Sequence, residues 1–198
     1  MSEMISDGTG KGYQAKVDNL NRLHTHGTVR TEEEFGAIAG QTYNVNTATI
    51  SLTSSNESAV LYFKNDSNED IFISNIGFLL GNSTGGAGDI HITVLKNPTA
   101  GTIIDNALPA PVEVNKNFGS SLELTADAFK GAEGHTFTDG SIAYRSLLAS
   151  AARTYVIATG NIVLTRGKSI GVKITPQAGN TAMDIQMFLS ILSTENVD

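Results

Sequence analysis

The stretch Ile162-Val163-Leu164-Thr165-Arg166-Gly167-Lys168-Ser169-Ile170-Gly171-Val172-Lys173-Ile174-Thr175-Pro176 predicts two β-strands joined by a tight turn. Its second half alternates, so the aliphatic side chains Ile170, Val172 and Ile174 share one face of a strand. Gly167 can adopt the positive φ that a tight turn often requires. The proline that ends the stretch has no N–H for a sheet ladder, so it closes the strand. The stretch therefore predicts a core hairpin of an all-β sandwich.

The composition suits a turn-rich β protein. Charged residues make up only 17% of the 198 residues, while the chain has 20 glycines and no cysteine. Without cysteine, disulfides and thiolate chemistry are excluded, which fits assembly in a reducing cytosol. The net charge of −7 gives no general attraction for nucleic acid or anionic lipid, so we expect neither as a partner. The N-terminus lacks the pattern of a signal peptide, and no segment has the ~20 apolar residues of a membrane-spanning helix.

Short apolar segments bounded by turn clusters predict the strands of the sandwich. They are Tyr43–Leu52, Ala59–Lys64, Asp70–Leu80, Asp89–Leu95, Gly101–Ile104, Val112–Val114, Tyr155–Thr159 and Met183–Leu192. Residues 105–154 are the least regular region, and Ser141–Ala152 within it predicts a short helix or an irregular lid. About eight strands in two packed sheets predict a jelly-roll-like β-sandwich over residues 39–198.

Residues 1–38 precede this sandwich and are predicted to be an extended arm with a small hairpin. Residues 1–12 are polar and rich in glycine, so we expect them to order only against a partner. Tyr13–Asp18 and Arg22–His26 predict the two strands of the hairpin. Thr31 and the acidic residues after it predict one short helical turn.

His24 and His26 are the first candidates for a metal site. Their spacing places both on one face of a strand, but zinc needs three or four ligands. The other histidines, His91 and His135, are far away in the sequence, and Asp18 is the only nearby acid before Glu32. A role in packing and hydrogen bonding at an interface is therefore the better interpretation, and we predict no metal site.

Other catalytic and cofactor motifs are incomplete. Gly167-Lys168-Ser169 mimics the end of a phosphate-binding loop, but position 162 is Ile and a strand follows instead of a helix. Asp66, Glu69 and Asp70 lie in a turn cluster, where solvated loop carboxylates are the simpler interpretation and Ca²⁺ binding is the alternative. There is no Gly-x-Ser-x-Gly motif, and the lack of Trp weakens a carbohydrate-binding hypothesis. We predict no catalytic residues, no cofactor and no enzymatic activity.

Several segments resemble virion proteins of tailed phages, and the resemblance spans nearly the whole chain. The segments are residues 7–18, Asn21-Arg22-Leu23, 56–65, 81–86, 117–121, 129–134 and the stretch quoted first. The resemblance implies a structural protein of the particle, in the first place a capsid decoration (cement) protein. Such a protein sits on the outer surface of the capsid, assembled in the host cytoplasm, and ties neighbouring capsomers together. The implied partners are the major capsid protein and two further copies in a homotrimer.

The expected contact region for the capsid or a neighbouring subunit is residues 1–30. Its candidate interface residues are Lys11, Tyr13, Arg22, His24 and His26. Two alternatives stay open. One is a tail, neck or head-fibre protein, including one that recognises a host surface. The other is a sugar-active enzyme or lectin on a jelly-roll scaffold, which would need paired carboxylates or a Ca²⁺ site in one cleft.

Overall fold

The computed structural model describes residues 16–17, 23–24, 31–53, 56–81, 89–105, 110–148, 153–177 and 183–194. The chain divides into two compact units, Met1–Thr31 and Glu32–Asp198. In the first unit, β1 (Lys16–Val17) and β2 (Leu23–His24) pair antiparallel, with Lys16 opposite His24. The small hairpin predicted in this region is therefore confirmed.

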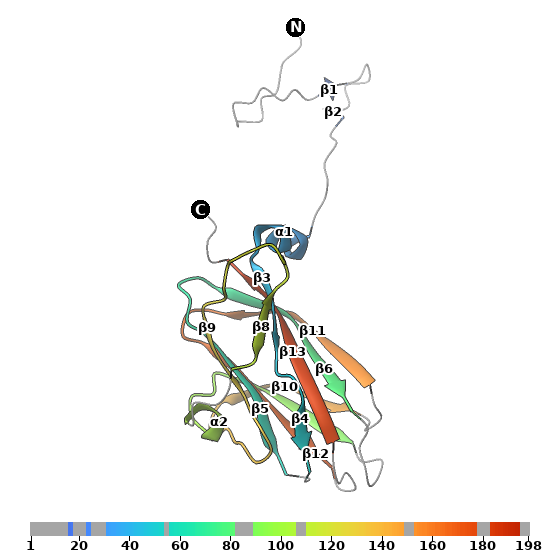
Figure 1. Ribbon diagram of the computed structural model, residues 1–198, viewed down its shortest axis with the longest axis vertical. Helices are drawn as coiled ribbons and strands as arrows, with labels where there is room; N and C mark the ends of the chain where they lie inside the picture. The colour runs from blue at the N-terminus through green and yellow to red at the C-terminus, as the bar shows by residue number, and fades with distance from the viewer. Residues whose placement is uncertain are drawn as a thin grey trace. The chain divides into compact units, whose positions relative to one another are not determined.

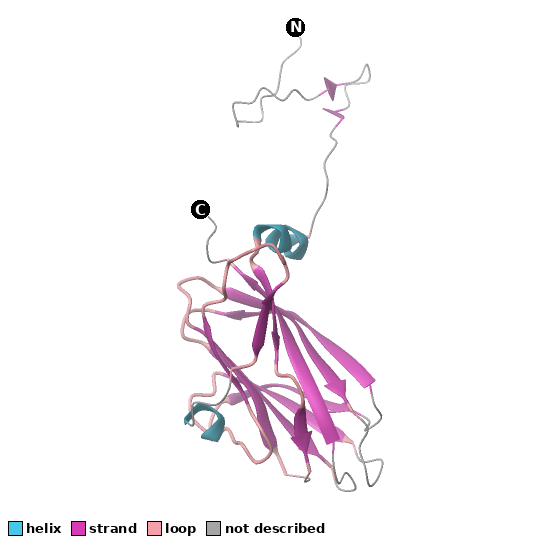
Figure 2. Ribbon diagram, viewed as in Figure 1, coloured by secondary structure: helices cyan, strands magenta, loops and turns pink. Residues whose placement is uncertain are grey.

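Two antiparallel sheets form the second unit (Figures 1 and 2). The large sheet has the order β11-β6-β13-β3-β8, and β4 also pairs with β13. Its strands are β3 (Thr42–Asn46), β4 (Ile50–Leu52), β6 (Ile71–Leu80), β8 (Val112–Asn115), β11 (Arg153–Leu164) and β13 (Met183–Ser193). The small sheet has the order β10-β7-β12-β5-β9. Its strands are β5 (Ser58–Asn65), β7 (Ile90–Lys96), β9 (Ala126–Lys130), β10 (Ser141–Leu148) and β12 (Ser169–Pro176).

The strand order is that of a jelly roll. Strands β3, β13, β6 and β11 of one sheet face β5, β12, β7 and β10 of the other, and the chain passes between the sheets at nearly every connection. The last two strands each lie between two earlier ones, β12 between β5 and β7 and β13 between β3 and β6. This is the nested double Greek key of jelly rolls, so the predicted fold class is confirmed. Strands β8 and β9, inserted between β7 and β10, extend the two sheets.

The core lies between the sheets and is built by alternation along each strand. Phe63 of β5, Phe78 of β6 and Ile92 of β7 are fully buried in one cluster. The predicted alternation in β12 is confirmed, because Ile170, Val172 and Ile174 all point into this cluster. The opposite side of β12 is also covered. A Cβ at Gly171 would lie 2.7 Å from the Phe137 ring and 2.8 Å from Pro98, so only glycine fits there.

The predicted hairpin over residues 162–176 is wrong in its pairing. Both strands exist, and Gly167 has the expected positive φ of 72°. However, β11 pairs with β6 in the large sheet, while β12 pairs with β5 and β7 in the small sheet. The turn thus crosses from one sheet to the other. Each strand buries its apolar side chains in the same core. The alternation of apolar residues is therefore the same whether two strands are neighbours in one sheet or lie in opposite sheets.

Three other predicted elements also differ. Gly101–Ile104, predicted as a strand, forms the short helix α2 (Thr102–Asp105), in which the N–H groups of Ile104 and Asp105 donate to the Gly101 carbonyl. The helix or lid predicted at Ser141–Ala152 is the strand β10 over its described residues, where exposure on both faces removes the alternating pattern. The single helical turn predicted near residue 31 extends over Glu32–Ala39 as α1, and it ends at Gly40, whose φ is 75°.

Two predicted boundaries also shift. Tyr43–Leu52 is divided into β3 and β4 by a break at which Ala48 has a φ of 54°. Conversely, Tyr155–Thr159 belongs to the same strand, β11, as the first half of the stretch at 162–176. Among the described residues, no helix has the length and apolar content needed to cross a membrane.

Candidate functional site

The structure does not test the predicted interface in residues 1–30. Lys11, Tyr13, Arg22 and His26 lie outside the described residues. His24 is placed by its backbone alone, at the end of β2. These residues therefore remain predicted contacts.

Of the three predicted turn carboxylates, that of Asp66 makes an ion pair within the fold, while Glu69 and Asp70 accept hydrogen bonds through their backbone carbonyls. Asp66 forms an ion pair with Lys64 at 2.6 Å, and this hydrogen bond holds the pKa of Asp66 below its ordinary value. The buried amide of Asn65 organises the turn, since it donates to the carbonyls of Glu69 and Leu164. Within the part of the chain that the structure describes, no three His, Cys, Asp or Glu side chains gather into a possible metal site.

The outward side of the large sheet presents an uncharged surface over four rows, and Asp184 of β13 lies beyond them beside Ser51 of β4. Register partners across the strands form rows of outward-facing side chains, and we call these rows the open face. The rows are Thr154–Leu79–Gln186, Val156–Gly77–Phe188–Asn46–Val112, Asn75–Ser190–Asn44–Val114 and Val163–Phe72–Leu192–Thr42. None of these residues is charged, in a chain with a net charge of −7.

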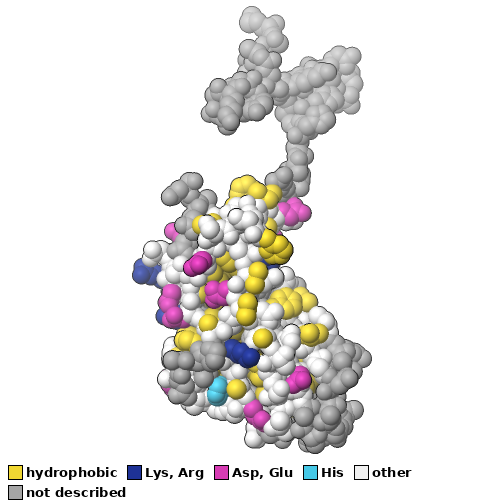
Figure 3. Space-filling model, in the orientation of Figure 1, with side chains coloured by type: hydrophobic (Ala, Val, Ile, Leu, Met, Phe, Trp, Pro, Cys, Tyr) yellow, Lys and Arg dark blue, Asp and Glu magenta, His cyan; other side chains and the backbone are white. Residues whose placement is uncertain are grey.

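Eight of the 16 residues of the open face are apolar, and seven are polar but uncharged. Leu79 is 45% exposed, Val156 56% and Val112 58%. The ring of Phe188 lies against Gly77, where a Cβ would collide with it, so the glycine lets the ring lie close to the sheet. In Figure 3, hydrophobic side chains run down the middle of the face in view. Contiguous exposed apolar surface on a folded domain indicates an interaction site.

Helix α1 adds apolar surface beside the open face. It packs on β3 and β13, and its outward side chains Phe35 and Ile38 are more than half exposed. A helix on a solvated surface normally turns such side chains inward. Their exposure next to β3 and β13 extends the apolar surface beyond the strands.

The outward side of the small sheet, here the covered face, is different. Residues 97–140, which connect β7 to β10, place α2 and the loop containing Phe137 over it. Tyr62 stacks on Phe129 with ring centroids 5.7 Å apart and touches Phe137 at 6.4 Å. Ile103 of α2 is fully buried beside them. The chain therefore shields this apolar surface with its own segments.

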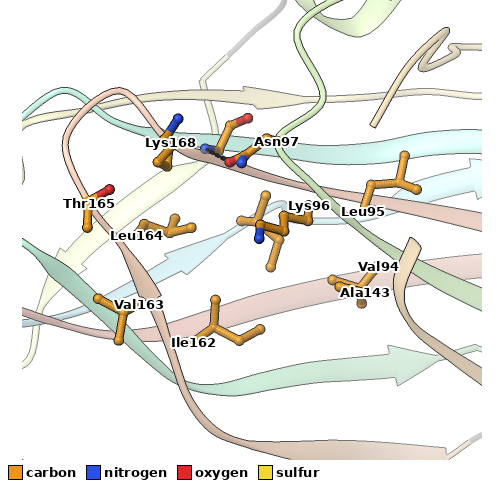
Figure 4. A pocket seen from close by; sticks show the side chains of 12 residues that line it. Val94, Leu95, Lys96, Asn97, Ala143, Ile162, Val163, Leu164, Thr165 and Lys168 are labelled. Atoms are coloured by element: carbon orange, nitrogen blue, oxygen red, sulfur yellow. Dashed lines mark hydrogen bonds between the residues drawn. The ribbon is translucent and has the colours of Figure 1, made fainter. Parts of the chain in front are cut away.

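A pocket of about 440 Å³ opens at the flank where β10 and β11 are the outermost strands. Its lining residues are Val94, Leu95, Lys96, Asn97, Ala143, Ile162, Val163, Leu164, Thr165, Lys168, Ser169 and Ile170. Figure 4 shows aliphatic side chains around the space together with Lys96 and Lys168. No acidic residue lines this flank pocket, and neither lysine has an ion-pair partner among the described residues.

The open face carries a sequence signal that the strand predictions did not use. Residues 71–80, 154–165 and 185–193 contain no charged side chain. Strands without charge on either face are typical of sheets covered on both sides. The signal thus predicts a second cover for the large sheet. The described chain covers only one end of the rows, where Gly36 of α1 packs against Thr42 and Leu192.

The sequence matches no family model and no curated protein. Three solved structures illustrate the range of structural likeness. A tomato aspermy virus structure has 11% identity and a TM-score of 0.31, covering 88% of this chain and 85% of the viral one. An Israeli acute paralysis virus particle has 11% identity and a TM-score of 0.28, covering 99% and 98%. A thaumarchaeal aminopeptidase has 11% identity and a TM-score of 0.25, covering 68% and 25%. At these scores the likeness assigns no function, and the strand order defines the fold.

Proposed function

We propose that this chain is a structural protein of a virus particle, in particular a capsid decoration (cement) protein of the tailed-phage type. The open face is the observation that carries the proposal. An acidic domain that displays one uncharged, apolar sheet face is built to dock on another surface. The resemblance to tailed-phage virion proteins indicates that the surface is the outer capsid shell, and the proposal includes no catalytic role.

The chemistry of the open face suits a permanent contact. It contains no charge that would need to be desolvated or paired, and burying unpaired charge is the main penalty at interfaces. The amides of Asn44, Asn46 and Asn75 supply hydrogen bonds that do not depend on ionic strength. The acidic groups lie elsewhere and keep the exposed side soluble.

The size of the open face is also adequate. Strands about 4.8 Å apart and outward rows about 6.8 Å apart give about 33 Å² for each position, or roughly 520 Å² for the 16 residues of the four rows. This area is about two thirds of the ~800 Å² that one partner contributes to a standard interface, before α1 is added. Three copies in the expected homotrimer would raise the effective concentration of each contact, including the predicted arm contacts in residues 1–38.

The copy number of the protein in purified particles tests the proposal. Quantitative mass spectrometry against the major capsid protein should find hundreds of copies per particle if the chain decorates the shell. About a dozen or fewer would instead support the alternative of a tail, neck or head-fibre protein. Absence from the particle would overturn the structural role.

A variant pair tests the open face itself. Leu79→Glu with Val156→Glu places two carboxylates on the open face, where both side chains are about half exposed, so the fold should survive. We expect binding to undecorated capsids to weaken at least tenfold. The matched control is Ala132→Glu with Thr138→Glu, two exposed positions in residues 97–140, away from the open face, and it should bind normally. Equal binding by both variants would remove the open face from the proposal.

A further inference from the structure

We propose that the flank pocket receives residues 3–7 of a neighbouring copy of this chain, added as a strand along the free edge of β10. The inference rests on the self-association included in the proposed function, and it names the two surfaces that meet. Each copy then gives one segment and offers one pocket. Such a contact is heterologous and can close into a ring of three.

The edge of β10 is suited to an added strand. Among the described strands β10 pairs only with β7, so its other edge presents unpaired main-chain groups. Natural edge strands are usually short, charged or interrupted by proline. β10 has eight residues, no proline and a single charged side chain, Arg145. Strand addition to such an edge is a common mode of peptide recognition.

The register of β10 directs the added strand toward the flank pocket. A shift in pairing between Ile142 and Tyr144 leaves Ala143 without a partner on β7, and Ala143 lines the pocket. The side chains of Ile142 and Tyr144 are about half exposed beside it. A strand laid along this edge would point alternate side chains into the space between the sheets.

The lining of the flank pocket defines its ligand. Val94, Ile162 and Ile170 form an apolar floor suited to an aliphatic side chain. Lys96 and Lys168 bring two ammonium groups, while the lining contains no carboxylate. The complementary ligand is an extended segment with an aliphatic residue between two acidic ones on the same face.

The sequence contains one such segment. Glu3, Ile5 and Asp7 alternate, so in a strand they face the same way with neighbours about 7 Å apart. No other aliphatic residue in the 198 has an acidic residue both two positions before and two positions after it. Because β1 and β2 pair, residues 16–24 fold back on themselves, and the 15 residues of 8–15 and 25–31 can span about 50 Å when extended.

Charge exchange tests the contact in the full-length protein. Lys96→Glu with Lys168→Glu should shift the protein from trimer to monomer in native mass spectrometry, with association at least tenfold weaker. Glu3→Lys with Asp7→Lys should do the same, and combining all four substitutions should restore the trimer. The matched control is Lys116→Glu with Lys130→Glu, which changes the net charge equally but lies away from the pocket lining. A trimer that survives the first pair, or no restoration by the four, would overturn the proposal.

Disulfide trapping gives a second readout, since the chain has no cysteine of its own. Mixing Ile5→Cys protein with Ala143→Cys protein under mild oxidation should give a disulfide-linked pair of copies. Mixing Ile5→Cys with Val114→Cys, on the open face, should not. A link that forms only within a single chain carrying both cysteines would place the segment in its own pocket and contradict the neighbour. A trapped pair from a protein absent from virus particles would leave this inference standing while the proposed function fails.

Discussion

The outward faces of the two sheets differ in how far the chain itself covers them. On the small sheet, α2 and a loop within residues 97–140 bury Tyr62 and Ile103, and Phe129 is partly buried beside them. On the large sheet, Leu79, Val156 and Val112 stay about half exposed, and no charged residue lies in the rows around them. Both faces carry apolar side chains, but the described chain covers the open face only at one end, where α1 lies over Thr42 and Leu192. The comparison shows that apolar sequence on a sheet face does not by itself indicate whether the chain or a partner covers it.

The largest expected contrast between the faces is in stability. Ile103→Ala removes a fully buried side chain from the covered face and should lower the free energy of unfolding by about 2–5 kcal/mol. Leu79→Ala removes a half-exposed side chain from the open face and should cost less than about 1 kcal/mol. Urea unfolding of the two variants measures both values. Equal losses would mean that the open face contributes to the folded domain as much as the covered one.

A second, smaller contrast concerns how much stability each face loses at low pH. Asp139 ties the loop to the segment before α2, because its carboxylate accepts hydrogen bonds from the Thr99 hydroxyl and from the N–H groups of Thr99 and Ala100. These bonds hold the pKa of Asp139 below its ordinary 3.8. Their contribution to stability is therefore present above pH 3.8 and is lost as the pH falls through the lowered pKa.

Asp139→Asn should remove this part of the acid sensitivity of the covered face. Urea midpoints from neutral pH to below 3.8 should fall less steeply in the variant than in the natural protein. Asp66, whose pKa is also lowered, remains in both proteins and cancels in the difference. Parallel curves would show that Asp139 does not stabilise the cover through its charge.

The smallest effect is expected at the edge of the large sheet. Glu113 on β8 is exposed, but neighbouring atoms partly desolvate its carboxylate, and this desolvation, followed by the charge of Glu123, raises its pKa above the ordinary 4.5. The ionised form is thus disfavoured in the folded protein, so stability falls as the pH rises through the raised pKa and is regained toward pH 4.5. Glu113→Gln should raise the urea midpoint slightly at neutral pH and leave it unchanged below pH 4.5. A lower midpoint at neutral pH would reverse the assigned sign.

The sequence predicts the fold class because alternation is a local property, and alternation in Ile170, Val172 and Ile174 holds in the structure. It does not predict which strands are neighbours, since β11 and β12 follow each other in the chain but lie in different sheets. The segment 101–104 is predicted as a strand but is helical, because four residues are too few to distinguish the two-residue period of a strand from the 3.6-residue period of a helix. The open face could have been predicted from the uncharged residues 71–80 and 185–193. The flank pocket could not, because Lys96 and Lys168 are brought together only by the strand order.

The central positions of β12 and β13 have a consequence for the kinetics of folding. Both strands come last in the chain, yet each lies between two strands made much earlier, and Leu192 of β13 pairs with Thr42 of β3. Neither sheet can close during synthesis until its final strand has left the ribosome, so β3, β5, β6 and β7 must wait with open edges that invite aggregation. Such non-local pairing slows folding. It should also slow unfolding, because opening either sheet requires pulling a strand out of its middle, so the folded domain should persist long after conditions turn against it.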